Sequence, residues 1–126
     1  MENTLPKEER LSGKTSITDL VSEGRWGSVS GLKYCYRQGS GKPCNRLMVS
    51  VPKKFFKRAV KRNLLKRRIR ESYRTQKRIL PLAEIDLMIL YNTKDIMDSE
   101  TIRGLVETIL SRISKSIQNP SQDNSK

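Results

Sequence analysis

The sequence predicts an α+β fold, a small two-layer sandwich in which helices pack on a central sheet of three or four strands. Two segments with alternating apolar residues predict strands, and a long basic segment without Gly or Pro predicts a helix. An apolar run followed by helical periodicity completes the order αββαβα. Because 126 residues provide one core, we expect a flexible segment at 1–10, one domain at 11–115 and a disordered tail at 116–126.

The first three elements are predicted to be a short helix and a β-hairpin. Apolar residues recur at near-helical spacing from Leu11 to Val21, and Gly24 ends this helix. Alternation over residues 29–36, and again over 47–51, predicts two strands. The Gly, Ser and Pro residues between them are typical of a turn. We therefore expect these two strands to pair with each other as a hairpin.

The second half of the chain is predicted to form a long helix, a buried strand and a final helix. Residues 57–78 are rich in helix-forming side chains, and Pro81 follows them. Residues 85–91 form a nearly continuous apolar run, which is typical of a strand buried on both faces. Asp98 is a predicted N-cap. After it, apolar residues recur at the i, i+3, i+4 spacing of a helix, namely Ile102, Leu105, Val106, Ile109, Leu110 and Ile113.

The positive charge of the chain is concentrated in residues 53–78. This segment holds thirteen Lys and Arg residues and one acid, whereas the other hundred residues hold thirteen bases and twelve acids. Such a local excess favours a polyanionic partner, nucleic acid first and an anionic membrane surface second. A merely solvated helix face is the remaining alternative. The arginines favour nucleic acid, because a guanidinium donates two parallel hydrogen bonds to phosphate.

The basic helix is predicted to have two unlike sides, because successive side chains are about 100° apart. One side carries Asn63, Lys66, Arg67, Arg70 and Arg74. The opposite side carries Leu65, Ile69, Ser72 and Gln76, with Tyr73 at the edge. We expect the apolar side to pack on the sheet and the basic side to face outward. Arg58, at the start of this segment, adds to the candidate RNA-binding residues.

Several other functions are excluded by the composition. The chain has no histidine and two cysteines, Cys35 and Cys44, so it lacks the ligands of a zinc site, and we expect two free thiols. Glu84 and Asp86 are interpreted as solubility charges at a strand edge, and the acids from Asp95 to Glu100 as helix N-terminal charge. We therefore predict no catalytic residue, no metal site and no organic cofactor in the chain. No apolar run approaches the ~18 residues of a membrane span, and no secretion signal is present, which predicts a cytoplasmic protein.

The basic helix also resembles a known family. From Arg62 to Arg74 the sequence reads Arg-Asn, two residues, Lys-Arg, two residues, Arg-Glu, and then an aromatic residue and Arg. This pattern closely resembles the helix of the bacterial ribonuclease P protein component. The strand ending in Lys53-Lys54, and Arg10-Leu11 followed by Gly24, resemble other parts of that family. The resemblance covers about residues 5–114.

The resemblance implies a fold and a function. The sheet would contain a left-handed parallel strand–helix–strand crossover, against the usual right-handed rule. The chain would be the protein subunit of an RNA-based endonuclease that removes the 5′ leader from precursor tRNA. Its partners would be ribonuclease P RNA and precursor tRNA, with no obligate protein partner and no membrane. The RNA would hold the catalytic Mg²⁺. A ribosomal or general RNA-binding protein and a stand-alone metal-dependent nuclease are the alternatives.

The family pattern also assigns residues. The RNA-contacting set implied by the resemblance is Arg62, Asn63, Lys66, Arg67 and Arg70, with Lys53 and Lys54 as accessory phosphate contacts. A leader cleft would lie between sheet and helix, with Ile17 and Val21 where several relatives have phenylalanine. Because aliphatic side chains cannot stack on bases, either Tyr34 or Tyr36 supplies an aromatic surface, or charge dominates leader binding. Trp26 is interpreted as core or loop cover.

Overall fold

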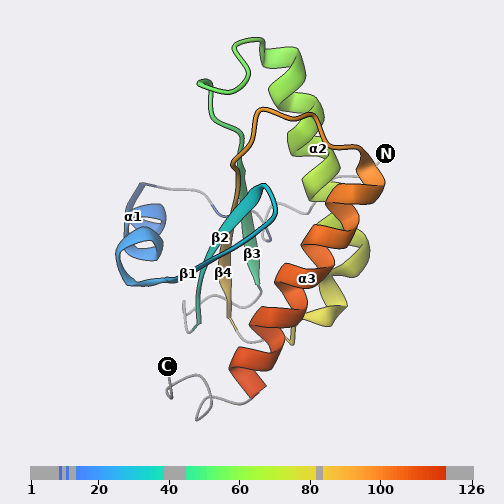
Figure 1. Cartoon of the computed structure of the whole chain (residues 1–126). Coiled ribbons are helices and arrows are strands. Elements are labelled where there is room, and N and C mark those ends of the chain that lie inside the picture. Colours follow the sequence, from blue (N-terminus) through green and yellow to red (C-terminus); the bar gives the residue numbers. More distant parts are fainter. Residues whose placement is uncertain (1–8, 10, 12–13, 39–44, 82–83, 119–126) are drawn as a thin grey trace.

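The computed structural model describes residues 9, 11, 14–38, 45–81 and 84–118, with the side chains of 14–16 and 118 left out. A four-stranded sheet in the order β1-β2-β4-β3 lies between helices on its two sides (Figure 1). The elements are α1 Lys14–Glu23, β1 Arg25–Val29, β2 Leu32–Arg37, β3 Arg46–Ser50, α2 Ala59–Gln76, the 3-10 turn η2 Lys77–Ile79, β4 Asp86–Tyr91 and α3 Ser99–Gln118. The structure thus confirms the α+β class and contains four strands.

The predicted hairpin between the two alternating segments is wrong. β4 lies between β2 and β3, pairing antiparallel with β2 and parallel with β3. The apolar run of β4 is buried on both faces, so the centre of the sheet is where its side chains are best shielded from water. The hairpin partner of β2 is instead β1, through a turn in which Gly31 has a φ of 82°. β1 escaped prediction because its residues are mostly exposed and show no alternation of apolar and polar side chains.

α2 connects the two parallel strands β3 and β4, which is the strand–helix–strand unit that the resemblance implied. Its left-handed sense stays a prediction. The helix spans residues 59–76 rather than 57–78, and η2 continues the chain to Ile79. α2 contacts β3, whereas α3 contacts β1 and β2, so the two helices lie side by side over one face of the sheet (Figure 1).

The two faces of the sheet are covered unequally. Leu32, Tyr34 and Tyr36 of β2 belong to the main core, which they share with α2 and α3. Cys35, from the opposite face of β2, packs with Leu20 of α1 in a much smaller cluster. α1 therefore adds a partial helical layer on the second face of the predicted two-layer sandwich (Figure 1). Cys35 is a free cysteine that is completely shielded from solvent, and this burial raises the pKa of its thiol to about 11.

Residues near both ends of the predicted domain make contacts or belong to regular elements. Glu9, within the segment predicted to be flexible, forms an ion pair with Lys77 at 2.7 Å. The backbone N–H of Leu11 donates to the carbonyl of Leu47 at 2.8 Å, along the outer edge of β3. At the other end, α3 continues to Gln118, past the predicted end of the domain at residue 115. Residues 1–8, 10, 119–126 and Cys44 lie outside the described residues.

We expect Leu65→Ala to destabilise the fold by about 2–4 kcal/mol, because it leaves a cavity between α2 and the sheet. Leu65 is fully buried in the main core. Urea unfolding followed by circular dichroism measures the destabilisation. Leu64→Ala is the matched control, since the neighbouring Leu64 is exposed on the same helix. Equal destabilisation by the two variants would contradict the packing described for α2.

Candidate nucleic-acid interface

α2 presents the basic side that the sequence predicts. Its buried residues are Leu65, Ile69, Ser72, Tyr73 and Gln76. These are the residues predicted to face the sheet, and Tyr73, expected at the edge, is buried as completely as the others. The side chains of Asn63, Arg67 and Arg70 are exposed on the other side, with Lys66 half-buried at the flank. The predicted division of the helix into two sides is therefore confirmed.

Some basic side chains of α2 already have partners in the protein. Nη1 of Arg62 donates to the carbonyls of Phe56 at 2.9 Å and Lys57 at 2.8 Å, so it holds the preceding loop against the helix. Arg68 donates to the carbonyl of Met97 at 2.6 Å. Arg74 pairs with Glu71 one turn back, and this hydrogen bond lowers the pKa of the Glu71 carboxyl. These three arginines have a structural role, whatever else they bind.

Five other basic or amide side chains of α2 make no hydrogen bond or ion pair with any described residue: Lys61, Asn63, Lys66, Arg67 and Arg70. The start of α2 also favours an anionic partner, because Arg58 makes no side-chain cap there and the first turn contains no acid. Free N–H groups at a helix N-terminus attract anions, and positive side chains there are repelled by the partial positive charge of the helix dipole. This end of the molecule therefore carries positive charge that an anionic partner would relieve.

The loop between β3 and α2 extends the cationic surface. Figure 1 shows this loop and the start of α2 together at one end of the molecule. Lys53 and Lys54 are exposed there, and Nζ of Lys54 lies 5.1 Å from the centre of the Phe55 ring. Phe56 anchors the loop, with its ring in edge contact with Tyr91 at 5.7 Å between centroids. The loop lysines are thus held beside the N-terminal half of α2.

The four residues predicted to line a leader cleft do not come together. Ile17 and Val21 belong to α1, and Val21 is 43% exposed. Tyr34 and Tyr36 point to the opposite face of the sheet and are 7% and 8% exposed in the main core. A Cβ on Gly27 would lie 2.4 Å from the Tyr34 ring, which shows how closely this ring crosses β1. The two tyrosines therefore cannot supply an aromatic surface on the side of α1.

Trp26, interpreted as core or loop cover, is not a core residue. Trp26 is 46% exposed, and its pairing with Cys35 places it on the α1 face of the sheet. The sequence signal was available: Trp26 directly precedes Gly27 in a segment without alternation, where no buried strand face is expected. The side of the sheet on which Trp26 lies could be recognised only once the face that α1 covers was known.

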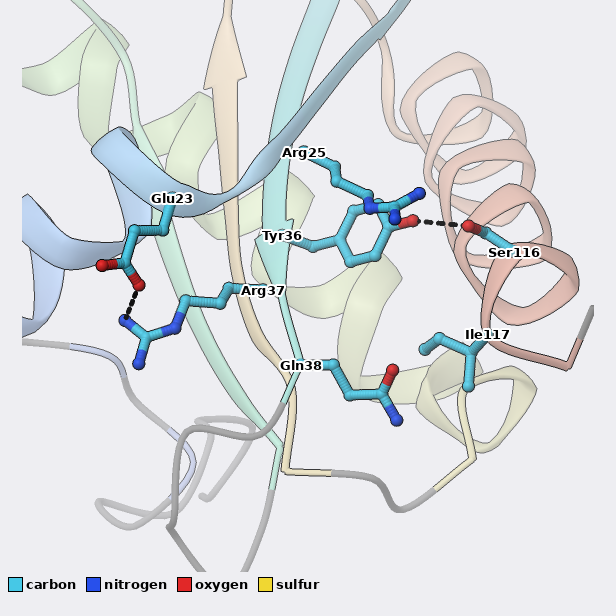
Figure 2. Close-up of a pocket in the computed structure, with 7 residues that line it drawn as sticks. All are labelled: Glu23, Arg25, Tyr36, Arg37, Gln38, Ser116 and Ile117. Atoms are coloured by element: carbon cyan, nitrogen blue, oxygen red, sulfur yellow. Dashed lines mark hydrogen bonds and ion pairs between the residues drawn. The ribbon is translucent and has the colours of Figure 1, made fainter. Parts of the chain in front are cut away.

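A separate hollow of about 290 Å³ lies at the far end of β2, beside the last turn of α3 (Figure 2). Arg37 approaches Glu23 there at 3.7 Å, and the Tyr36 hydroxyl donates to Oγ of Ser116 at 2.7 Å. Figure 2 shows the ion pair between Glu23 and Arg37 and the hydrogen bond between Tyr36 and Ser116 among the residues that line the hollow. None of the α2 residues lines this hollow, and its charged pair and its hydroxyl pair are already satisfied.

The carboxylates that could have suggested catalysis are engaged elsewhere. Asp86, interpreted as a strand-edge charge, is instead buried and accepts two hydrogen bonds of 2.8 Å from Arg46. Asp98 caps α3 as predicted, accepting from the Thr101 N–H at 2.8 Å, and its hydrogen bonds from Thr101 lower its pKa. Among the described residues, no three Cys, Asp or Glu side chains are grouped to hold a metal ion.

The fold and the cationic surface define a class: a small basic α+β protein that presents one exposed helix side to a polyanion. Within the described residues, no helix has the length and apolarity to span a membrane. The family model described as Ribonuclease P matches residues 5–114. The chain belongs to this family and is a protein subunit of ribonuclease P.

Relatives and solved structures agree with this assignment. The chain is 34% identical to the ribonuclease P protein component of Porphyromonas gingivalis over 123 residues, covering 90% of this chain and 88% of that one. It is 38% identical to the component of Dictyoglomus turgidum, covering 79% and 77%. The solved RNase P protein from Thermotoga maritima has a TM-score of 0.72 at 28% identity, covering 82% of this chain and 96% of that one. The comparisons do not favour a ribosomal or general RNA-binding protein.

Proposed function

We propose that this chain binds the RNA component of ribonuclease P and the 5′ leader of precursor tRNA, and so promotes maturation of the tRNA 5′ end. The observation that carries the proposal is the outer side of α2, where Asn63, Lys66, Arg67 and Arg70 are without partners among the described residues. Like charges one turn apart repel by a few tenths of a kcal/mol per pair. RNA phosphates at this surface would replace that repulsion with charge-assisted hydrogen bonds.

The other predicted RNA-binding residues extend this surface. Lys53 and Lys54 in the loop, with Arg58 at the start of the helix, would contact phosphates near the N-terminus of α2. Nη1 of Arg62 is committed to the loop carbonyls, and its other guanidinium N–H groups make no hydrogen bond with any residue that the structure describes. Arg74 would contribute charge from its pair with Glu71. We place the single-stranded leader on the other side of the sheet, along α1, where Ile17 and Val21 lie.

In this proposal the chain supplies binding and positioning, and the RNA partner carries out phosphodiester hydrolysis with Mg²⁺ that it mainly holds itself. The family resemblance of α2 supports this division. No step of the reaction is assigned to a side chain of this protein. Because precursor tRNA is processed in the cytoplasm of a bacterium, we place the protein there.

Reconstitution tests the proposal. Purified protein, a bacterial ribonuclease P RNA and a labelled precursor tRNA are mixed at low Mg²⁺ concentration, and release of the 5′ leader is followed. We expect efficient cleavage only when protein and RNA are both present. Tight binding of the protein to the RNA without any stimulation of cleavage would support a general RNA-binding protein instead.

The leader contact has its own test. The affinity of the holoenzyme for precursor tRNA is measured at several salt concentrations with leaders of increasing length. We expect log K to fall with log salt by about 0.7 for each single-stranded leader phosphate that is neutralised. Longer leaders should bind more tightly until the binding surface is filled. Affinity that is independent of leader length would contradict leader binding while leaving the contact with the catalytic RNA intact.

A further inference from the structure

Trp26 occupies an unusual position at the junction of α1 and the sheet. Directly opposed residues of antiparallel strands project to the same face, and Trp26 is opposite Cys35, which packs under Leu20 of α1. The indole Nε1–H donates to the carbonyl of Val21 in the last turn of α1, at 3.4 Å. The ring therefore lies beside α1 on the second face of the sheet, where we place the leader.

The indole is held in place while remaining accessible. Besides the bond to Val21, Nζ of Lys33 lies 5.7 Å from the ring centroid, a cation–π distance. These two contacts fix one edge and the orientation of the ring, yet the residue remains 46% exposed. A ring that served only as core would be expected to be largely shielded from water, as the tyrosines of β2 are.

The other aromatic residues are less accessible than Trp26. The chain has seven aromatic residues, all of them among the described residues, and Trp26 is the one that is exposed. Phe55 is half-buried beside Lys54. The remaining five are buried in the main core, namely Tyr34, Tyr36, Phe56, Tyr73 and Tyr91. On the α1 face, where Ile17 and Val21 cannot stack, Trp26 is thus the available π surface.

The charges around Trp26 suit a nucleotide. Lys33 projects to the same face as Cys35, two residues away on β2, and can meet a phosphate attached to a base that stacks on the indole. The acids of α1 nearest to this region, Asp19 and Glu23, lie within 4 Å of Arg37 and are paired with it. The arrangement of an accessible ring with an adjacent cation is the combination that binds single-stranded nucleic acid.

We infer that Trp26 stacks on an unpaired base of the single-stranded leader, with Lys33 contacting an adjacent phosphate. The inference rests on the proposed leader binding and assigns its aromatic contact to one residue. Such stacking tolerates any base sequence, because every base offers a π face. Removal of the ring should therefore weaken leader binding for all leader sequences.

The protein carries its own probe for this inference, because Trp26 is the one tryptophan of the chain. The holoenzyme, assembled from the full chain and ribonuclease P RNA, is titrated with precursor tRNA or with the same tRNA lacking a leader. We expect the leader to quench the tryptophan fluorescence, beyond the absorption correction measured with free tryptophan, and leaderless tRNA to leave it unchanged. Binding of the leader-bearing substrate with unchanged fluorescence would overturn the inference.

Substitution provides a second measurement. Trp26→Leu should weaken binding of leader-bearing substrate by about 5- to 150-fold, with leaderless tRNA unaffected, and Trp26→Phe should recover part of the affinity. Ile96→Ala is the matched control, since Ile96 is equally exposed, at 46%, in the loop before α3. If Trp26→Leu binds and cleaves as the unsubstituted protein does, the stacking role is refuted and leader binding stands. If the unsubstituted protein fails to stimulate cleavage, the proposed function itself fails.

Discussion

Replacing Arg67 and Arg70 together by alanine is expected to lower affinity for ribonuclease P RNA by at least about 100-fold. Each arginine is exposed on α2 without a partner among the described residues. A hydrogen bond to a charged group contributes about 1.5–3 kcal/mol, which corresponds to roughly 10- to 150-fold per residue. The salt dependence of binding should also become shallower, by about 1 in slope for each phosphate that the variant no longer neutralises.

Two controls separate weaker binding from a disrupted fold. Alanine forms helices at least as well as arginine, so the helical circular dichroism of the double variant should be unchanged. Lys94→Ala combined with Arg103→Ala removes the same charge from exposed positions outside α2, and should reduce affinity much less. If both double variants reduce affinity equally, binding reflects net charge and not the outer side of α2.

The second large effect is expected for stability. Asp86→Ala should destabilise the fold by about 3–5 kcal/mol, because it leaves the half-buried Arg46 guanidinium without its carboxylate. The Asp86 side chain is 3% exposed and the Arg46 side chain 12%, and two hydrogen bonds of 2.8 Å join them across β3 and β4. Urea unfolding measures the change. The control is Glu107→Ala, at an exposed acid of α3, which should change the free energy of unfolding by no more than about 0.5 kcal/mol.

A paired replacement tests the cause of that destabilisation. Asp86→Leu combined with Arg46→Met removes both charges and fills the space with apolar side chains. Such replacements of buried ion pairs are often neutral or stabilising, so the double variant should be much more stable than Asp86→Ala. A double variant as unstable as the single one would mean that Asp86 acts through its packing and not through its charge.

The features that could be predicted from the sequence are those that depend on residues close together in the chain. The helical period placed Leu65 and Ile69 on the buried side of α2, because the angle between successive side chains is a property of the helix itself. The apolar run of β4 indicated burial on both faces. Asp98 indicated the start of α3, because an N-cap side chain accepts a hydrogen bond from a backbone N–H only three residues later, here that of Thr101. The residue pattern of α2 also indicated the family that the comparisons show.

The order of the strands in the sheet could not be predicted from residues close together in the chain. The turn residues after β2 suggested a hairpin with β3, but pairing is decided by which strand is stabilised most at the centre of the sheet, and β4 takes that place. The partner of Asp86 was equally hidden, because Arg46 is forty residues earlier and meets it through the parallel pairing of β3 with β4. Contacts between distant residues depend on the whole arrangement.

The composition and the helical period of α2 were enough to indicate an RNA-binding protein with one basic helix side. The tertiary structure decided which aromatic residue remains accessible. Alternation along β2 shows that Tyr34 and Tyr36 oppose Cys35, but it is silent on which face receives two helices and which receives only α1. Because α2 and α3 bury the tyrosines and α1 covers its face only in part, Trp26 on that face stays accessible to solvent.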